Sequence, residues 1–441
     1  MLLQLWFNSV VNSGSSFIAL RHRNFRLLWW GQLVSFSGTT MQNAAILWHV
    51  SVLVSSRHRA LALGMVGLVR VLPIIVLSLL SGVVADVVDR RRLMLLTQAS
   101  MAALAAILAF LTFHGLALIW PIYLLTALSS AAASFDGPAR QALVPVLVPR
   151  AHLANAISLN ATMMQIASVA GPSLAGVVIA SLGVSWAYAL NGLSFLMVIL
   201  ALLLMRNVPA HGDAGKLGIT PKAAKEGLRF VFSSPMIRST MLLDFFATFF
   251  SSAMTLLPIF AQDILRVGAK GYGWLYAAPS VGAVTASVSM IRMVDRIRRR
   301  GTVLLWAVVG YGLATVLFGL SHHFWLTFLC LVLTGATDTV SMVLRNLIRQ
   351  LETPDRLRGR MTGVNMVFYM GGPQLGELES GLVANWFGAP LSVVSGGIGC
   401  LFATACIAAR TPALARYRRD EPVHDLAGGP ARLSQGQSPA S

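Results

Sequence analysis

Twelve apolar runs, each long enough to cross a lipid bilayer as a helix, recur along this 441-residue chain. A transmembrane helix needs about 20 mostly apolar residues. Inside lipid the backbone must satisfy its own hydrogen bonds, and a helix does so within one segment. The runs cover residues 27–54, 61–85, 93–113, 116–135, 154–182, 186–205, 241–264, 274–294, 303–320, 324–344, 361–386 and 391–409. The sequence therefore predicts an all-α integral membrane protein with twelve transmembrane helices.

The composition argues against a soluble protein. Hydrophobic residues make up 56% of the chain and charged residues 11%, and the mean hydropathy is +0.71. These values are typical of a protein with many membrane spans. The net charge of +18 would suit a nucleic-acid-binding protein, but the basic residues fall between the apolar runs. We therefore expect a membrane protein that is not an enzyme and has no nucleic-acid partner.

The sequence indicates neither a metal site nor a cofactor. Cys330, Cys400 and Cys406 lie inside apolar runs and have no histidine at metal-ligand spacing, so neither a disulfide framework nor a metal site is predicted. No phosphate-binding segment of the G-x-x-x-x-G-K-[ST] kind occurs, so ATP is not the expected energy source.

The distribution of basic residues predicts the orientation in the membrane. Loops on the cytoplasmic side of a membrane protein carry an excess of Lys and Arg. Twenty-nine such residues lie on the side that an even number of spans assigns to both termini. The opposite connections carry only Arg57, Arg59, Arg266 and Lys270, and Arg70 lies inside a run. We therefore predict a multi-pass membrane protein with both termini in the cytoplasm.

One long connection divides the apolar runs into two sets of six. Residues 212–218 are rich in glycine, Pro221 suits a first helical position, and basic residues alternate with apolar ones over 222–231. This pattern predicts an interfacial helix on the membrane surface. The predicted parts are a loose leader (1–20), a six-helix half (21–206), a linker (207–240), a second six-helix half (241–415) and a disordered tail (416–441).

The two halves repeat each other weakly. The repeated features are residues 86–92 with 295–300, Arg140 and Pro149 with Arg345 and Pro354, and Gly171-Pro172 with Gly372-Pro373. They follow in the same order and at similar offsets. Such duplication is typical of transporters built from two repeats, with the substrate site at the repeat interface.

The connection after the second run is Gly82-Val-Val-Ala-Asp86-Val-Val-Asp-Arg90-Arg91-Arg92. Glycine commonly ends a helix, an aspartate can cap the next helix or hold a cation, and three arginines mark a membrane surface. We predict a conformational clasp between two helices at the cytoplasmic face, formed by Gly82, Asp86 and the three arginines. The alternative is that the arginines act only as an orientation signal.

This connection resembles the loop 2–3 signature of the major facilitator superfamily of transporters. That signature usually has glycine where this chain has Asp89. The ending Asp-Arg-Arg-Arg is similar to the branch that holds enterobactin exporters and macrolide-efflux proteins. The resemblance covers about residues 21–415 and implies twelve helices in two six-helix halves. Arg140 is the expected partner of Asp86 in the clasp.

The fifth run also resembles a transporter motif. Gly171, Pro172 and Gly176 resemble part of the span-five signature of drug–proton antiporters, although Thr162 and Ala175 stand where that signature has glycine. The resemblance favours proton antiport. The alternative is a proline kink with close packing of small residues.

Four carboxylates and one histidine are candidates for proton coupling. Asp244, Asp338, Glu377 and Glu379 lie within apolar runs, and His49 lies in the first run as a candidate relay. A charged side chain at membrane depth costs roughly 2.5–3.5 kcal/mol, so it usually faces a cavity or a partner. A purely structural hydrogen bond is the alternative for each of them.

Helical spacing separates these candidates further. Glu377 and Glu379 lie about 200° apart around a helix and cannot both face one cavity. Glu377 shares its side with Gln374, whereas Glu379 shares its side with two glycines suited to helix packing. We therefore favour Glu377 for the cavity. Arg345 follows Asp338 by two helical turns, so these two side chains are expected to pair.

By resemblance we expect a monomeric secondary transporter of the bacterial inner membrane that exports small organic molecules, of the drug or siderophore type, in exchange for protons and with alternating access. Its partners are the substrate, protons and the lipid bilayer. The alternatives are an importer or lysophospholipid flippase of the same fold, or a membrane receptor or scaffold without transport. A scaffold has no need of four carboxylates at membrane depth.

Overall fold

The computed structural model describes residues 15–206, 228–250, 252–354 and 357–418. The first six long helices are α2 (Arg23–Leu53), α3 (Arg59–Val87), α4 (Arg90–Phe113), α5 (Trp120–Leu147), α6 (Leu153–Ser181) and α7 (Val184–Leu204). The second set starts with an interrupted segment made of α9 (Pro235–Phe250), η3 (Ala253–Leu256), α10 (Leu257–Ile259) and η4 (Phe260–Ile264). It continues with α11 (Gly268–Met293), α12 (Arg300–Leu320), α13 (Phe324–Glu352), α14 (Arg358–Phe387) and α15 (Ala389–Arg410). The predicted twelve-helix, all-α membrane fold is confirmed.

Eight helical segments in the described part of the chain are long and apolar enough to span a membrane by composition alone. The other four long helices, α2, α5, α11 and α14, lie outside this set. These helices carry buried or half-buried polar side chains such as Gln32, Asp136 and Glu377. Polar residues inside a membrane protein usually face the bundle interior. The more polar helices are therefore the first place to look for a functional site.

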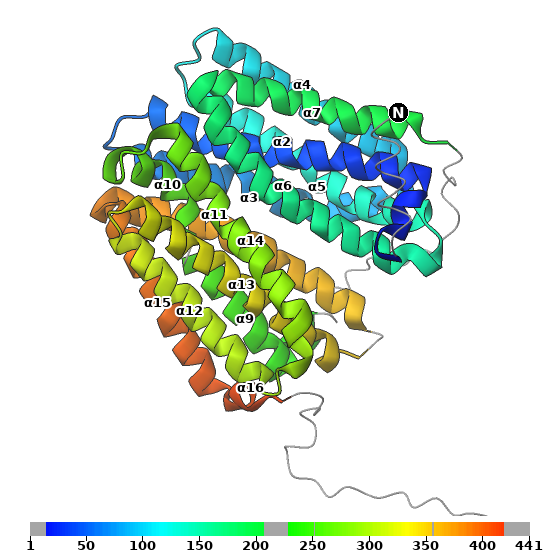
Figure 1. The fold of residues 1–441 in the computed structure, drawn as a ribbon, viewed down its shortest axis with the longest axis vertical. Helices are drawn as coiled ribbons and strands as arrows, with labels where there is room; N and C mark the ends of the chain where they lie inside the picture. Colours follow the sequence, from blue (N-terminus) through cyan, green and yellow to red (C-terminus); the bar gives the residue numbers. More distant parts are fainter. Residues whose placement is uncertain (1–14, 207–227, 251, 355–356, 419–441) are drawn as a thin grey trace, which may run out of the picture.

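The two halves are built in the same way (Figure 1). In chain order, α2 to α7 correspond to α9, α11, α12, α13, α14 and α15. Helix α6 packs against α2 in the first half, and α14 packs against α9 in the second. Across the halves, α6 packs against α11 and α14 packs against α3. These two crossings are equivalent under the repeat, as expected of a transporter with two related halves.

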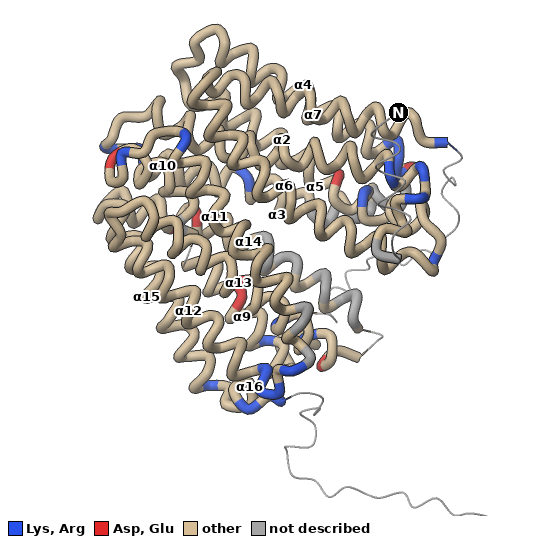
Figure 2. The backbone as a smooth tube through the Cα atoms, in the orientation of Figure 1, with Lys and Arg blue, Asp and Glu red and all other residues tan. Residues whose placement is uncertain are grey.

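Most of the basic residues gather at one end of both bundles (Figure 2). We call this the basic end, and we call the other, which carries Arg59 and Lys270, the opposite end. The ribbons of the two halves meet toward the opposite end, at α10 and α11, and diverge toward α16 (Pro412–Arg416) at the basic end (Figure 1).

The positions of the buried apolar clusters agree with this arrangement of the two halves. One cluster joins both halves and includes Ala44, Ala175, Tyr272 and Ala384 near the opposite end. Toward the basic end, one separate cluster belongs to the first half and another to the second. Because shared apolar burial holds elements together, the halves are fastened at the opposite end.

The helix boundary near the arginine run differs from the prediction. Gly82 does not end the second helix, because α3 continues to Val87. The turn is only Val88 and Asp89, and α4 begins at Arg90. Asp89, rather than Asp86, caps α4, since its carboxylate accepts a hydrogen bond from the Arg92 backbone N–H at 2.8 Å. The side chain of Asp86 lies outside the described residues.

The chain ends also differ in part from the prediction. Residues 15–20, placed in a loose leader, belong to η1 (Ser15–Arg21), and Ala19 is buried there with its N–H donating to Asn155 Oδ1 at 3.0 Å. Tyr417, placed in the predicted tail, is also buried. The remaining leader (1–14) and tail (419–441) lie outside the described residues. So does most of the predicted interfacial helix, of which 228–233 is helical.

Candidate functional site

The crossing of α3 and α14 depends on glycine on both helices. A Cβ on Gly381 would lie 2.5 Å from the Gly64 Cα, and a Cβ on Gly67 would lie 2.6 Å from the Glu377 Cβ. Contacts this short are not available to real side chains, so only glycine allows the helices to approach so closely. The close approach brings Glu377 of the second half against α3 of the first half.

Glu377 meets a buried arginine at this crossing. Arg70 of α3 is 8% exposed, donates to Asn43 Oδ1 at 3.2 Å and interacts electrostatically with the Glu377 carboxylate. Glu377 Oε2 is buried, and the side chain of Thr255 also interacts with this carboxylate. We call Asn43, Gly67, Arg70 and Glu377 the interface site. It places opposite charges of the two halves near each other in a buried position, whereas the Arg59–Asp263 pair between the halves is more exposed.

The equivalent crossing of α6 and α11 is also made by glycines. A Cβ on Gly176 would lie 2.7 Å from the Gly273 Cα, and a Cβ on Gly171 would collide with Thr40 and Ser37 of α2. Pro172 lies inside α6. The motif Gly171-Pro172-Gly176 therefore fits α6 against helices of both halves. This geometry agrees with the close-packing alternative, and it places the motif at the junction of the halves.

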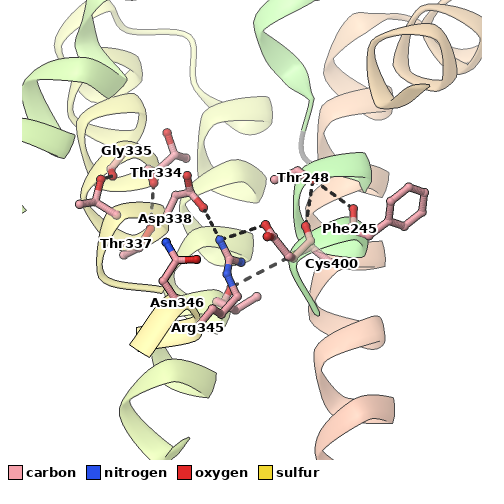
Figure 3. Close-up of polar contacts among 12 residues, drawn as sticks. Phe245, Thr248, Thr334, Gly335, Thr337, Asp338, Arg345, Asn346 and Cys400 are labelled. Atoms are coloured by element: carbon pink, nitrogen blue, oxygen red, sulfur yellow. Dashed lines mark hydrogen bonds and ion pairs between the residues drawn. The ribbon is translucent and has the colours of Figure 1, made fainter. Parts of the chain in front are cut away.

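A second charged group lies within the second half (Figure 3). Arg345 of α13 places Nη2 3.0 Å from Asp244 Oδ1 of α9 and 3.4 Å from Asp338 Oδ1. Arg349 places Nη1 3.6 Å from Asp244 Oδ2 and also donates to Asn365 of α14. Asp244, Arg345 and Arg349 are almost fully buried. We call these five residues the C-half cluster; it ties α9, α13 and α14 together.

The C-half cluster confirms the predicted pairing of Asp338 with Arg345 and adds a shorter pair that the sequence did not indicate. Asp244 and Asp338 are the two predicted candidates that the structure brings together. Removing one member of a buried ion pair leaves an uncompensated charge. Asp244 therefore fits a structural role, because its carboxylate contacts two buried arginines.

The first half has a related group around Asp136 in α5. Its Oδ1 accepts hydrogen bonds from Gln98 Nε2 at 2.9 Å and from Thr97 Oγ1 at 3.1 Å, both in α4. Arg140, one turn further along, lies over the ring of Phe36 with 4.3 Å between Cζ and the ring centroid. The expected contact between Arg140 and Asp86 involves a side chain outside the described residues.

The arginines after α3 bind helix carbonyls. Arg90 Nη1 donates to the Ala142 carbonyl at 3.2 Å, and Arg91 Nη2 donates to the Leu203 carbonyl at 3.3 Å. The second acceptor belongs to the last turn of α7, where a cation also interacts favourably with the helix dipole. These arginines join α4 to α5 and α7, so they do more than mark the membrane surface.

His49 and Glu379, the two remaining candidates, have different surroundings. His49 is buried, and its Nδ1 lies 3.1 Å from the Tyr188 hydroxyl within the first half. Glu379 is half-buried on α14, two residues beyond Glu377. The structure therefore does not gather the five predicted coupling residues into one site.

Two histidines form a contact at the basic end of the first half. His22 Nε2, just before α2, lies 2.8 Å from His152 Nδ1, just before α6. Burial first, and then the charge of His152, lower the pKa of His22 below its usual value of 6.5. A hydrogen bond between two imidazoles needs a neutral acceptor, so this contact weakens when both rings are protonated. The sequence analysis did not single out this pair.

Sequence reasoning also missed Arg70 as the partner of Glu377. Arg70 is the one Lys or Arg that lies inside an apolar run away from its ends, and a charge at that depth is expected to have a partner. That signal was available, but the partner lies on a distant helix.

Comparison with known proteins agrees with the two-half fold. Enterobactin exporter EntS from Escherichia coli O1:K1 / APEC is 27% identical over 352 residues, which cover 78% of this chain and 82% of that protein. Enterobactin exporter EntS from Citrobacter koseri is 28% identical over 355 residues, which cover 79% and 82%. A bacterial homologue of the human lysosomal transporter Spinster, solved in an inward-facing and unoccupied conformation, has a TM-score of 0.71 at 15% identity and matches 90% of this chain and 98% of that chain.

The twelve helices and the repeated halves have the major facilitator fold, and the match to a family model identifies a membrane transporter of that type. Within that class, the chain belongs to the transmembrane secretion effector family, whose profile matches residues 14–422. The resemblance to this superfamily, near the enterobactin-exporter branch, is thereby confirmed.

Proposed function

We propose that this transporter exports small organic molecules of the drug or siderophore type across the bacterial inner membrane by proton antiport. The observation that carries the proposal is the position of Glu377: a buried carboxylate of one half that faces a buried arginine of the other. The relatives named as enterobactin exporters support the direction of transport and the class of substrate.

The charge distribution supports placing the basic end in the cytoplasm. The halves are fastened at the opposite end, so the described conformation then corresponds to an inward-facing state. Three polar contacts join the halves there. They are the ion pair between Arg59 Nη1 and Asp263 Oδ2 at 2.8 Å, the hydrogen bond from Gln262 to Ser51 at 2.6 Å, and that from the Tyr272 hydroxyl to the Ala44 carbonyl at 2.8 Å. Alternating access requires these contacts to break when the opposite end opens.

The interface site couples this movement to a proton. Burial disfavours the ionised form of Glu377. With the opposite end closed, the charge of Arg70 opposes that cost, because opposite charges attract strongly in a poorly solvated site. With the opposite end open, Glu377 moves away from Arg70 and its neutral, protonated form is favoured. Glu377 thus takes up a proton from outside and releases it to the cytoplasm, as antiport requires.

One proton per cycle is a sufficient energy source. A charge crossing 100 mV yields about 2.3 kcal/mol. Since about 1.4 kcal/mol corresponds to a tenfold ratio, this sustains roughly a 50-fold substrate gradient.

Proteoliposomes containing the full chain and a trapped pH dye test the proposal. A catecholate siderophore, a macrolide and a hydrophobic cation are supplied in turn, and substrate-dependent proton movement is measured. Glu377→Gln should abolish that movement and retain exchange of substrate for substrate, because an amide keeps the shape and cannot titrate. Glu379→Gln, on the same helix, is the matched control and should behave like the parent.

Three outcomes contradict the proposal. Proton movement that persists in Glu377→Gln would show that Glu377 is not the proton carrier. Transport of the three probes without proton movement in the parent contradicts antiport. Substrate accumulation in the direction of import would favour the importer alternative.

A further inference from the structure

The short C-terminal helix α16 is fixed to the start of α12. The Gly301 N–H donates to the Tyr417 carbonyl at 3.2 Å, and Thr302 Oγ1 donates to the Ala415 carbonyl at 2.8 Å. Leu414 and Tyr417 are buried, and any side chain at Gly301 would collide with the Leu414 carbonyl. These contacts make α16 a permanent part of the basic end of the second half.

An apolar groove of about 290 Å³ runs between α12 and α16. It is lined by Thr302, Leu305, Trp306, Val309 and Ala415. Trp306 is 69% exposed and lies six residues beyond the start of α12, about 9 Å along the helix axis. Tryptophan is enriched at this depth, where headgroups meet hydrocarbon. We call this the Trp306 groove.

Exposed arginines surround the same end of the second half (Figure 2). They are Arg296, Arg298 and Arg299 before α12, Arg410 at the end of α15, and Arg416 and Arg418 at the end of α16 and beyond it. Asp295 is the one acidic residue among positions 294–300 and 410–418. We call the six arginines the arginine patch. It brings positive charge from three separate segments next to an apolar groove.

We propose that the Trp306 groove and the arginine patch form a binding site for an anionic phospholipid of the cytoplasmic leaflet. An acyl chain lies in the groove beside Trp306, and the phosphate of the headgroup lies among the arginines. The groove alone would accept any acyl chain, so the patch provides the preference for negative charge. The proposal uses the membrane orientation proposed above and does not depend on transport.

The two parts of the site predict different effects. Each basic residue near a membrane surface contributes about fivefold to the binding of anionic lipid. Neutralising three arginines should therefore reduce the preference for anionic lipid by about a hundredfold. Shortening Trp306 removes apolar contact and should weaken anionic and zwitterionic lipid alike.

Native mass spectrometry of the full-length protein in detergent measures bound phosphatidylglycerol against phosphatidylcholine of equal chain length. The test variant is Arg299→Gln/Arg416→Gln/Arg418→Gln. The matched control, Arg23→Gln/Arg150→Gln/Arg206→Gln, removes three exposed arginines from the basic end of the first half. Trp306→Ala is compared with Trp325→Ala, which removes an equally exposed tryptophan at the opposite end.

We expect the parent and the arginine control to prefer phosphatidylglycerol and the patch variant to show that preference reduced by about a hundredfold. Trp306→Ala should bind less of both lipids, and Trp325→Ala should match the parent. Equal binding of both lipids by the parent would overturn the proposal, as would equal losses in the patch variant and its control. Displacement of the lipid by soluble glycerol 3-phosphate at matched concentration would also overturn it, because the site would then recognise phosphate alone.

Discussion

Replacing Gly381 by alanine should push the transporter out of the described conformation. The added Cβ would lie 2.5 Å from the Gly64 Cα and 2.7 Å from the Ala60 carbonyl oxygen. Ordinary van der Waals contact begins near 3.4 Å, so α3 and α14 must separate by about 1 Å. Both obstructing atoms belong to backbone, which cannot turn aside as a flexible side chain would.

The size of the effect follows from the cost of overpacking. Inserting a methyl group into a close-packed contact costs about 1–3 kcal/mol. The penalty falls only on the conformation in which the halves touch at the opposite end. A coupling energy of this size shifts a two-state equilibrium by about 5- to 150-fold. Alanine also has a higher helix propensity than glycine. This stabilises both conformations equally, so it does not change the equilibrium between them.

Spin labels at Arg57 and Lys270, both exposed at the opposite end, report the separation of the halves there. Double electron–electron resonance on Gly381→Ala should show a larger fraction of long distances than the parent shows. Gly371→Ala on the same helix is the matched control, because a Cβ there would meet nothing within 4 Å. Identical distance distributions for parent and Gly381→Ala would refute the reasoning.

Three further predictions concern orientation, the buried ion pairs and pH. Reporter fusions at Gly215 should report the cytoplasm and those at Lys270 the outside, because the basic residues lie on one side. Asp244→Asn should lower the free energy of unfolding by about 3–5 kcal/mol in chemical-denaturation measurements, since it leaves buried arginine charge uncompensated. His22 has a folded pKa below its unfolded value, so its contact with His152 stabilises the fold above pH 6.5 and is lost as the pH falls through the lower folded pKa. The melting temperature should therefore fall on acidification, and His22→Gln should flatten that dependence.

Each of these predictions has a control and a contradicting result. A cytoplasmic signal at Lys270 is incompatible with the twelve-helix orientation. Asp263→Asn breaks an exposed pair and should cost at most about 1 kcal/mol; a loss as large as that of Asp244→Asn would show that burial does not set the cost. His322→Gln removes an exposed histidine at the opposite end. If it flattens the pH dependence as much as His22→Gln does, the histidine contact is not its source.

The sequence by itself determined the number of helices and their division into two sets of six. Apolar length, turn residues and the positions of arginine are local properties, and a membrane turns them directly into spans and connections. The repeated Gly-Pro pairs at Gly171 and Gly372 could also be recognised in the sequence, and they lie on equivalent helices of the two halves. Local reasoning failed at Gly82, where α3 continues because neighbouring helices support its last turns. The cap of α4 belongs to Asp89 rather than to Asp86, while the clasp at Asp86 stays a prediction.

Only the tertiary structure decided which charged side chains meet. Spacing along α13 gave the pair Asp338 and Arg345, because both residues lie on one helix face. Spacing could not give the shorter pair with Asp244, nor the meeting of Glu377 with Arg70, because each joins helices far apart in sequence. Those pairings depend on how closely two helices approach, and glycines such as Gly67 set that distance. The absence of a side chain at a glycine matters only where another helix occupies the space beside it. Whether that is so depends on the packing of the whole molecule.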